Sequence, residues 1–312
     1  MPETPAAPGP DRHTDPTQDP CTRFMRGGPE DGHREYEPPP VPTDVPTPAR
    51  AYGWLLGGKD NFQVDRDLVL GVCAKFPEDL DIARQNRLFL YRAVRYLARD
   101  LGITQFLDLG SGFPTDNNVH QVARQFQPDA RVVYVDIDPI VLAHGRALLA
   151  DSPQTTVITA DMTTPEEILT HPQTRELIDF TQPLGILMFS IPHCIPDEED
   201  ALRAIRGPVE QAAPGSYLAM SHVVADDEAT AQELTDVITG LGMPWRTRTP
   251  EHVDRWLADL QPVEPGLVDI NDWRPDPNQP PLGDCPPELE RYLGAGTNNR
   301  RMYEYGGVLR VP

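Results

Sequence analysis

Short apolar runs and helical patterns alternate through most of the chain. The apolar runs that are typical of buried strands cover residues 104–109, 131–136, 155–160, 184–190 and 216–222. Apolar residues at helical spacing follow them near 116–127, 138–150, 165–179, 198–212 and 228–241. This repeated order predicts an α/β fold, with a mostly parallel sheet covered by helices on both faces and right-handed crossovers.

Two more helices are predicted ahead of this alternation, over 65–76 and 79–101, because apolar residues recur there at helical spacing. We expect an N-terminal helical cap over residues 48–102. The main domain would then cover residues 103–312.

The pattern changes after residue 250. We predict a helix over 250–260, a strand over 263–273, a proline-rich loop over 272–291 and a closing strand over 302–311. The two strands would pair antiparallel, because no crossover helix separates them.

The N-terminal segment has a different composition, with 13 prolines in the first 48 residues and few large apolar side chains. Such a segment cannot bury enough surface to offset its ordering entropy. We therefore expect residues 1–47 to be disordered. A solvated tail is one interpretation, and a docking tail that presents polyproline surfaces is the other.

The charge balance argues against nucleic acid as a partner. The formal net charge is −21, and phosphate binding depends on lysine and arginine. The sequence has no apolar run of about 18 residues and no basic-then-apolar start, so we expect a cytoplasmic protein without a membrane partner. The scattered cysteines Cys21, Cys73, Cys194 and Cys285 favour reduced thiols over a disulfide framework or a metal site.

A glycine-rich turn follows the first strand of the alternation. Gly110 and Gly112 come just after Asp108, where the backbone would turn tightly and approach a ligand. The second strand ends in Asp136, 24 residues after Gly112, near the spacing at which a carboxylate meets ribose hydroxyls. Together they predict a nucleotide-like cofactor at the carboxyl ends of the strands.

The combined motifs resemble the class I S-adenosylmethionine (SAM)-dependent methyltransferases. The matching segments are Asp108-Leu109-Gly110-Ser111-Gly112, Val135-Asp136 and Ala160-Asp161-Met162, each at a strand end. More narrowly, LLGGKDNF at 55–62 and NRLFLYRAVRYL at 86–97 resemble a bacterial methyltransferase family formerly described as a domain of unknown function. Departures are Pro114 in place of a third glycine, and Gly53-Trp54 where an acidic residue and a tyrosine are expected.

The resemblance implies a Rossmann-like sheet of seven strands, the last antiparallel, with SAM as the cofactor. The candidate cofactor-binding residues are Tyr52, Asp108, Gly110, Ser111, Gly112, Asp136, Ile137, Asp161, Met162 and Ser190. Asp136 would accept from both ribose hydroxyls and Asp161 from the adenine amine. Asp161 has an alternative role as a helix cap, because Thr163, Thr164 and Pro165 follow it. Tyr52 and Trp54 lie against the sulfonium in one interpretation and pack in the core in the other.

Methyl transfer needs alignment of donor and acceptor and a group that removes the acceptor proton. His193 and His222 fall at the ends of the fourth and fifth predicted strands, and histidine titrates near neutral pH. We therefore take both as candidate catalytic bases. A hydrogen-bonded structural role is the alternative for each.

The sequence thus predicts a SAM-dependent methyltransferase that acts on a small-molecule oxygen, nitrogen or carbon. One alternative is an NAD-dependent oxidoreductase, which uses a similar glycine turn but is disfavoured by Pro114 and by the LLGGKDNF segment. The other is a SAM-binding module without catalysis. No metal is predicted, and the sequence does not indicate an oligomeric state.

Overall fold

The structure is a computed structural model and describes residues 43–149, 152–297 and 300–312. Residues 1–42 of the predicted tail over 1–47 therefore lie outside the described residues. Thr47 is described, and its side chain caps the first helix, α2 (Pro48–Leu55).

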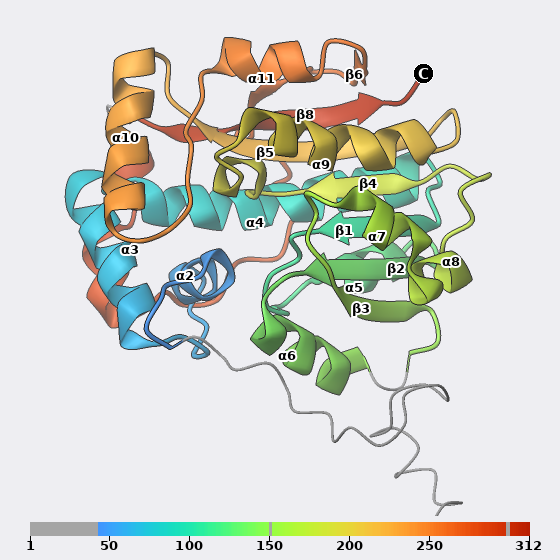
Figure 1. The fold of residues 1–312 in the computed structure, drawn as a ribbon, viewed down its shortest axis with the longest axis horizontal. Helices are drawn as coiled ribbons and strands as arrows, with labels where there is room; N and C mark the ends of the chain where they lie inside the picture. Colours follow the sequence, from blue (N-terminus) through green and yellow to red (C-terminus); the bar gives the residue numbers. More distant parts are fainter. Residues whose placement is uncertain (1–42, 150–151, 298–299) are drawn as a thin grey trace, which may run out of the picture. The chain divides into compact units, whose positions relative to one another are not determined.

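The sheet follows the predicted alternation. Five strands run parallel: β1 (Gln105–Leu109), β2 (Arg131–Asp136), β3 (Thr155–Thr159), β4 (Gly185–Met188) and β5 (Tyr217–Val224). The closing strand β8 (Tyr303–Arg310) pairs antiparallel with β5 along its whole length. The strand order is β3-β2-β1-β4-β5-β8-β6, which confirms the predicted α/β fold with antiparallel final strands (Figure 1).

The single strand predicted over 263–273 was wrong. Two short strands, β6 (Gln261–Pro262) and β7 (Val268–Asp269), each pair antiparallel with β8 instead, so the described sheet has eight strands rather than seven. Pro265 has no backbone N–H to donate to a ladder, and Gly266 takes a left-handed φ of 101°. These two residues separate the two short strands.

Helices cover both faces of the sheet (Figure 1). α4 (Asp79–Arg95) continues as a π-helical turn, η2 (Tyr96–Asp100), and packs with α5 (Val119–Arg124) on one face. The other face carries α7 (Pro165–Thr170), α8 (Pro172–Leu177), α9 (Glu198–Gln211) and α11 (Pro250–Trp256). The helix predicted over 165–179 is divided into α7 and α8, because a proline inside a helix removes a hydrogen bond and clashes with the preceding turn.

The predicted N-terminal cap contributes to the core. Phe89, Val94 and Leu97 of α4 and η2 are buried against Phe106 and Val132 of the sheet. α2 packs with α3 (Gln63–Lys75) and α10 (Glu228–Gly240) in a further apolar cluster. Figure 1 shows α2 and α3 beyond the carboxyl ends of the parallel strands.

The remaining elements are α6 (Pro139–Leu149) after β2 and the 3₁₀ turns η3 (Pro192–Cys194), η4 (Pro287–Tyr292) and η5 (Ala295–Thr297). No helix in the described part of the chain is both long and apolar enough to cross a membrane.

Candidate functional site

The carboxyl ends of β1 to β4 open into a cavity of about 570 Å³ that α2 and α4 border on the other side. Ligand pockets of small-molecule proteins have roughly this size. All of the predicted cofactor-binding residues line it: Tyr52, Asp108, Gly110, Ser111, Gly112, Asp136, Ile137, Asp161, Met162 and Ser190. Residues far apart in the sequence meet here because parallel strands end at the same edge of a sheet.

The glycine turn after β1 forms one wall of the cavity. The backbone N–H groups of Gly110 and Ser111 donate to the carbonyl of Val135 over 2.9 and 3.1 Å, which holds the turn against β2. Gly110 and Gly112 both have left-handed φ angles, of 71° and 64°. A Cβ at Gly110 would lie 2.5 Å from the Ile191 side chain, whereas a Cβ at Gly112 would meet no atom within 4 Å. Gly110 is thus required for packing, and Gly112 faces open space.

Asp136 ends β2 beside this turn and is only 8% exposed. Its Oδ2 accepts from the N–H of Gly112 over 2.8 Å, and its Oδ1 accepts from the N–H of Asp138 over 2.9 Å. Burial raises the pKa of Asp136, and these two N–H groups oppose the rise. Each carboxylate oxygen keeps a lone pair, so Asp136 can still accept from a ligand.

Asp138 also borders the cavity, and, as in Asp136, each of its oxygens accepts from one protein donor. Oδ1 accepts from the N–H of Ile140 over 2.9 Å in the first turn of α6, and Oδ2 accepts from the Thr47 hydroxyl over 2.9 Å. Each oxygen of both acidic residues therefore has one protein donor, and the two residues differ in what they hold: Asp136 binds the glycine turn, whereas Asp138 binds the start of α6 and Thr47.

Asp108 and Arg87 place opposite charges on the wall below the turn. Asp108 is 4% exposed, and burial raises its pKa to about 7; the nearby Arg87 lowers the pKa and Asp136 raises it further. Arg87, from α4, donates to the carbonyl of Asp116 over 2.9 Å. Arg87 was not among the predicted site residues, although it lies within the 86–97 segment, because helical spacing alone does not show that its side chain faces this cavity.

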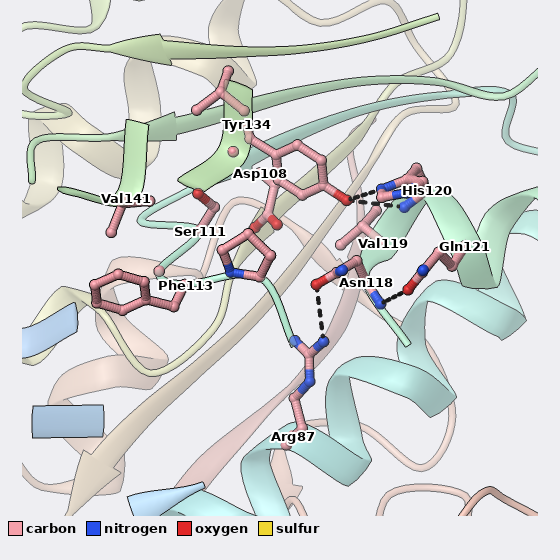
Figure 2. Close-up of a pocket in the computed structure, with 14 residues that line it drawn as sticks. Arg87, Asp108, Ser111, Phe113, Asn118, Val119, His120, Gln121, Tyr134 and Val141 are labelled. Carbon is pink, nitrogen blue, oxygen red and sulfur yellow. Dashed lines mark hydrogen bonds between the residues drawn. The ribbon is translucent and has the colours of Figure 1, made fainter. Parts of the chain in front are cut away.

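A smaller cavity of about 100 Å³ lies behind the glycine turn, and Figure 2 shows its lining. Arg87, Asp108, Ser111 and Gly112 line both cavities. Tyr134 lines the small one, and its hydroxyl accepts from the N–H of His120 over 3.0 Å. Both charges therefore border a recess in which the polar end of a ligand could lie.

The ends of β2 and β3 supply an apolar wall with a polar edge. Ile137 is 65% exposed, which is unusual for a large apolar side chain, and it borders the cavity together with Met162. The Oδ1 atom of Asp161 accepts from the N–H and hydroxyl of Thr163 over 2.9 and 2.8 Å, in a turn that precedes α7. Thr164, not Asp161, is the N-cap residue of α7. Oδ2 of Asp161 makes no hydrogen bond to the described residues.

The two aromatic residues of α2 differ in their surroundings. Tyr52 lines the cavity; its hydroxyl donates to the carbonyl of Ala83 over 3.0 Å and accepts from Nδ2 of Asn86 over 2.9 Å. Burial raises the pKa of Tyr52. Trp54 is 6% exposed and packs in the apolar cluster of α2, α3 and α10, as in the alternative interpretation of that residue.

The LLGGKDNF segment runs from Leu55, the last residue of α2, to the start of α3, and its residues do not line the main cavity. A Cβ at Gly57, where φ is 90°, would lie 2.5 Å from the carbonyl oxygen of Asp284, and one at Gly58 would lie 2.7 Å from that of Gly53. Gly57 thus allows close contact with the proline-rich loop over 272–291, and Gly58 allows close contact with α2.

The predicted bases His193 and His222 lie outside the main cavity. They are 1% and 0% exposed and contact each other, with ring centroids 5.3 Å apart. Nδ1 of His193 accepts from the N–H of Val223 over 3.1 Å. Burial lowers the pKa of both, to about 3 for His222, where Arg248 lowers it further. Their role as bases remains a prediction, and this arrangement offers neither imidazole a direct contact with a molecule in the main cavity.

Comparison with known proteins identifies the family. A family model described as S-adenosyl methyltransferase matches residues 34–312. The chain belongs to this family. A crystal structure of a candidate methyltransferase from Thermobifida fusca YX is 43% identical, covers 88% of this chain and 98% of its own, and has a TM-score of 0.75.

A second crystal structure agrees with this assignment. A DUF574 family protein from Streptomyces avermitilis MA-4680 is 34% identical, covers 86% of this chain and 99% of its own, and has a TM-score of 0.74. No curated protein matches the chain. The protein is therefore a SAM-dependent methyltransferase whose acceptor is unspecified, and the NAD-dependent alternative is not favoured.

Proposed function

We propose that this methyltransferase binds SAM in the 570 Å³ cavity and transfers the methyl group to a small-molecule acceptor. The observation that carries the proposal is the alignment of Asp108, Asp136 and Asp161 at the ends of three neighbouring strands around one cavity. We place the reaction in the cytoplasm, where free thiols such as that of Cys73 stay reduced.

The residues around the cavity suit the successive parts of SAM, from the amino acid end through the ribose to the adenine. Asp108 and Arg87 carry charges opposite to those of the ammonium and carboxylate of the amino acid end. Asp136 has a lone pair for each ribose hydroxyl. Ile137 and Met162 provide apolar surface for the adenine ring, and the open Oδ2 of Asp161 suits the exocyclic amine.

SAM supplies an electrophilic methyl group on a sulfonium. The Tyr52 ring lines the cavity, and we assign it to the sulfonium, since an aromatic face would stabilise a desolvated cation by about 1–2 kcal/mol. Ser190, Ile191 and Cys194 form the wall next to α2, and we assign the acceptor to this part of the cavity. A recess within one cavity suits a small molecule better than a polymer.

Isothermal titration calorimetry with SAM, S-adenosylhomocysteine (SAH) and NAD tests cofactor binding. We expect SAM and SAH to bind and NAD to give no heat of binding; binding of NAD alone would contradict the proposal. Turnover of labelled SAM with a small-molecule extract then tests catalysis. Tight SAM binding with no SAH formed from any extract would instead favour a SAM-binding module.

A further inference from the structure

Glu304 is a buried carboxyl group in the closing strand, and it was not among the predicted site residues. It lies on β8 directly opposite Val223 of β5 and is 2% exposed. Neither carboxylate oxygen has a hydrogen-bond partner among the described residues. Because burying an unpaired carboxylate is costly, a glutamate at this position calls for a role other than packing.

Two serine hydroxyls border this carboxyl group, those of Ser190 and Ser221. The Ser221 hydroxyl donates its proton to Oδ1 of Asn86 over 2.7 Å and accepts from the N–H of Ser190 over 2.9 Å. Its single proton is thus already engaged. Among the described residues the Ser190 hydroxyl has no acceptor other than Glu304, so its proton can face that carboxyl group.

Ser190 connects this buried group to the main cavity. It lines the cavity just after β4, and its φ of 55° lies in the left-handed region that a non-glycine residue rarely adopts. Strained residues of this kind gather at functional sites when the surroundings hold them in place. Here the bond from Ser190 N–H to Ser221 holds the backbone, and Ser190 borders both the cavity and Glu304.

The groups around Glu304 favour proton exchange near neutral pH. Burial raises the pKa of Glu304 to about 7, the two serine hydroxyls lower it, and Asp79 raises it. Tyr52 and Cys194 also face it, but burial raises the pKa of each, so they remain neutral. Asp79 is the other carboxyl nearby, and burial, with Glu78 next, raises its pKa to about 7 as well.

We propose that Glu304 takes up the proton that the methyl acceptor loses, by way of the Ser190 hydroxyl. This inference rests on the proposed function. The acceptor atom forms a bond to the methyl carbon while the methyl–sulfur bond breaks and its electron pair remains on sulfur. The acceptor proton passes to Oγ of Ser190 as the serine's own proton passes to the Glu304 carboxylate. Such a relay serves an acceptor with an O–H or N–H group.

Calorimetry with SAM and SAH tests whether Glu304 is coupled to the cavity. The two ligands share the amino acid, ribose and adenine parts, so proton release that is caused by these parts is common to both. Only SAM carries the sulfonium, and a nearby positive charge lowers the pKa of a carboxyl group. Titrations near pH 7 in buffers of different ionisation enthalpy should therefore show more proton release with SAM than with SAH.

The variants identify the group responsible. Glu304→Gln should abolish the difference between SAM and SAH, whereas the matched control Asp79→Asn should retain it. Ser190→Ala removes a hydroxyl that favours the charged carboxyl, so the pH of half-maximal release should rise. The proposal would be overturned if the SAM–SAH difference in proton release persisted in Glu304→Gln, or if only Asp79→Asn removed it. If the pH of half-maximal release were unchanged in Ser190→Ala, the serine would not be part of the relay.

A rate measurement completes the test. With labelled SAM and a small-molecule extract, Glu304→Gln should form SAH roughly 100-fold more slowly at pH 7, in the range of general-base effects, and lose the pH dependence of the rate. Equal rates in Glu304→Gln and the unaltered protein would refute the relay. Absence of SAM binding would instead refute the proposed function, together with this inference.

Discussion

Replacing Asp136 with alanine removes the carboxylate that we assign to the ribose. A hydrogen bond to a charged group contributes about 1.5–3 kcal/mol, so loss of one ribose contact weakens SAM binding roughly 10- to 150-fold and loss of both weakens it further. The change also leaves the N–H groups of Gly112 and Asp138 without their acceptor. Water entering from the cavity would offset part of that cost, and we expect stability to fall by about 1–3 kcal/mol.

Calorimetry with SAM measures the affinity and thermal unfolding measures the stability. Asp138→Ala is the matched control, because this residue borders the same cavity but binds α6 and Thr47 rather than the glycine turn, and we assign it no part of SAM. Loss of its cap on α6 should cost about 0.5–2 kcal/mol of stability with little change in SAM affinity. If Asp136→Ala bound SAM as tightly as the unaltered protein, the ribose assignment would be refuted.

Further substitutions separate packing, stability and charge. A Cβ at Gly110 would lie 2.5 Å from the side chain of Ile191, so Gly110→Ala should destabilise the fold more than Gly112→Ala. At Gly112 the cost is only that of a non-glycine residue with a left-handed φ, about 1–2 kcal/mol. Equal melting temperatures of the two variants would contradict this. Asp65→Ala leaves Arg50 buried without this partner, 3.0 Å away in the structure, and should cost about 3–5 kcal/mol in denaturant unfolding. Because the folded pKa of Asp108 is raised to about 7, its contribution to ligand-free stability is present below about pH 4 and is lost as pH rises through 7. The ionised form suits the SAM ammonium, so affinity should increase from pH 6 to 8, and Asp108→Asn should reduce that dependence.

Local patterns in the sequence were enough to predict the strand and helix order and most of the candidate cofactor site. Gly110, Asp108 and Asp136 stand at strand ends, and a parallel sheet brings its strand ends to one edge whatever the details of packing. The strand predicted over 263–273 was wrong. The prediction followed the apolar residues of this segment, whereas in the structure Pro265 and Gly266 interrupt the hydrogen-bond ladder.

Only the tertiary structure decided which polar groups meet. Glu304 lies between two tyrosines in an apolar strand, and its direction depends on the register with Val223, since a shift by one residue would turn it to the opposite face. Arg87 lines the cavity because α4 packs on the sheet. His193 and His222 do not line it and instead contact each other in a buried cluster. Strand-end positions follow from the chain itself, whereas the direction and environment of each side chain depend on contacts between segments far apart in the sequence.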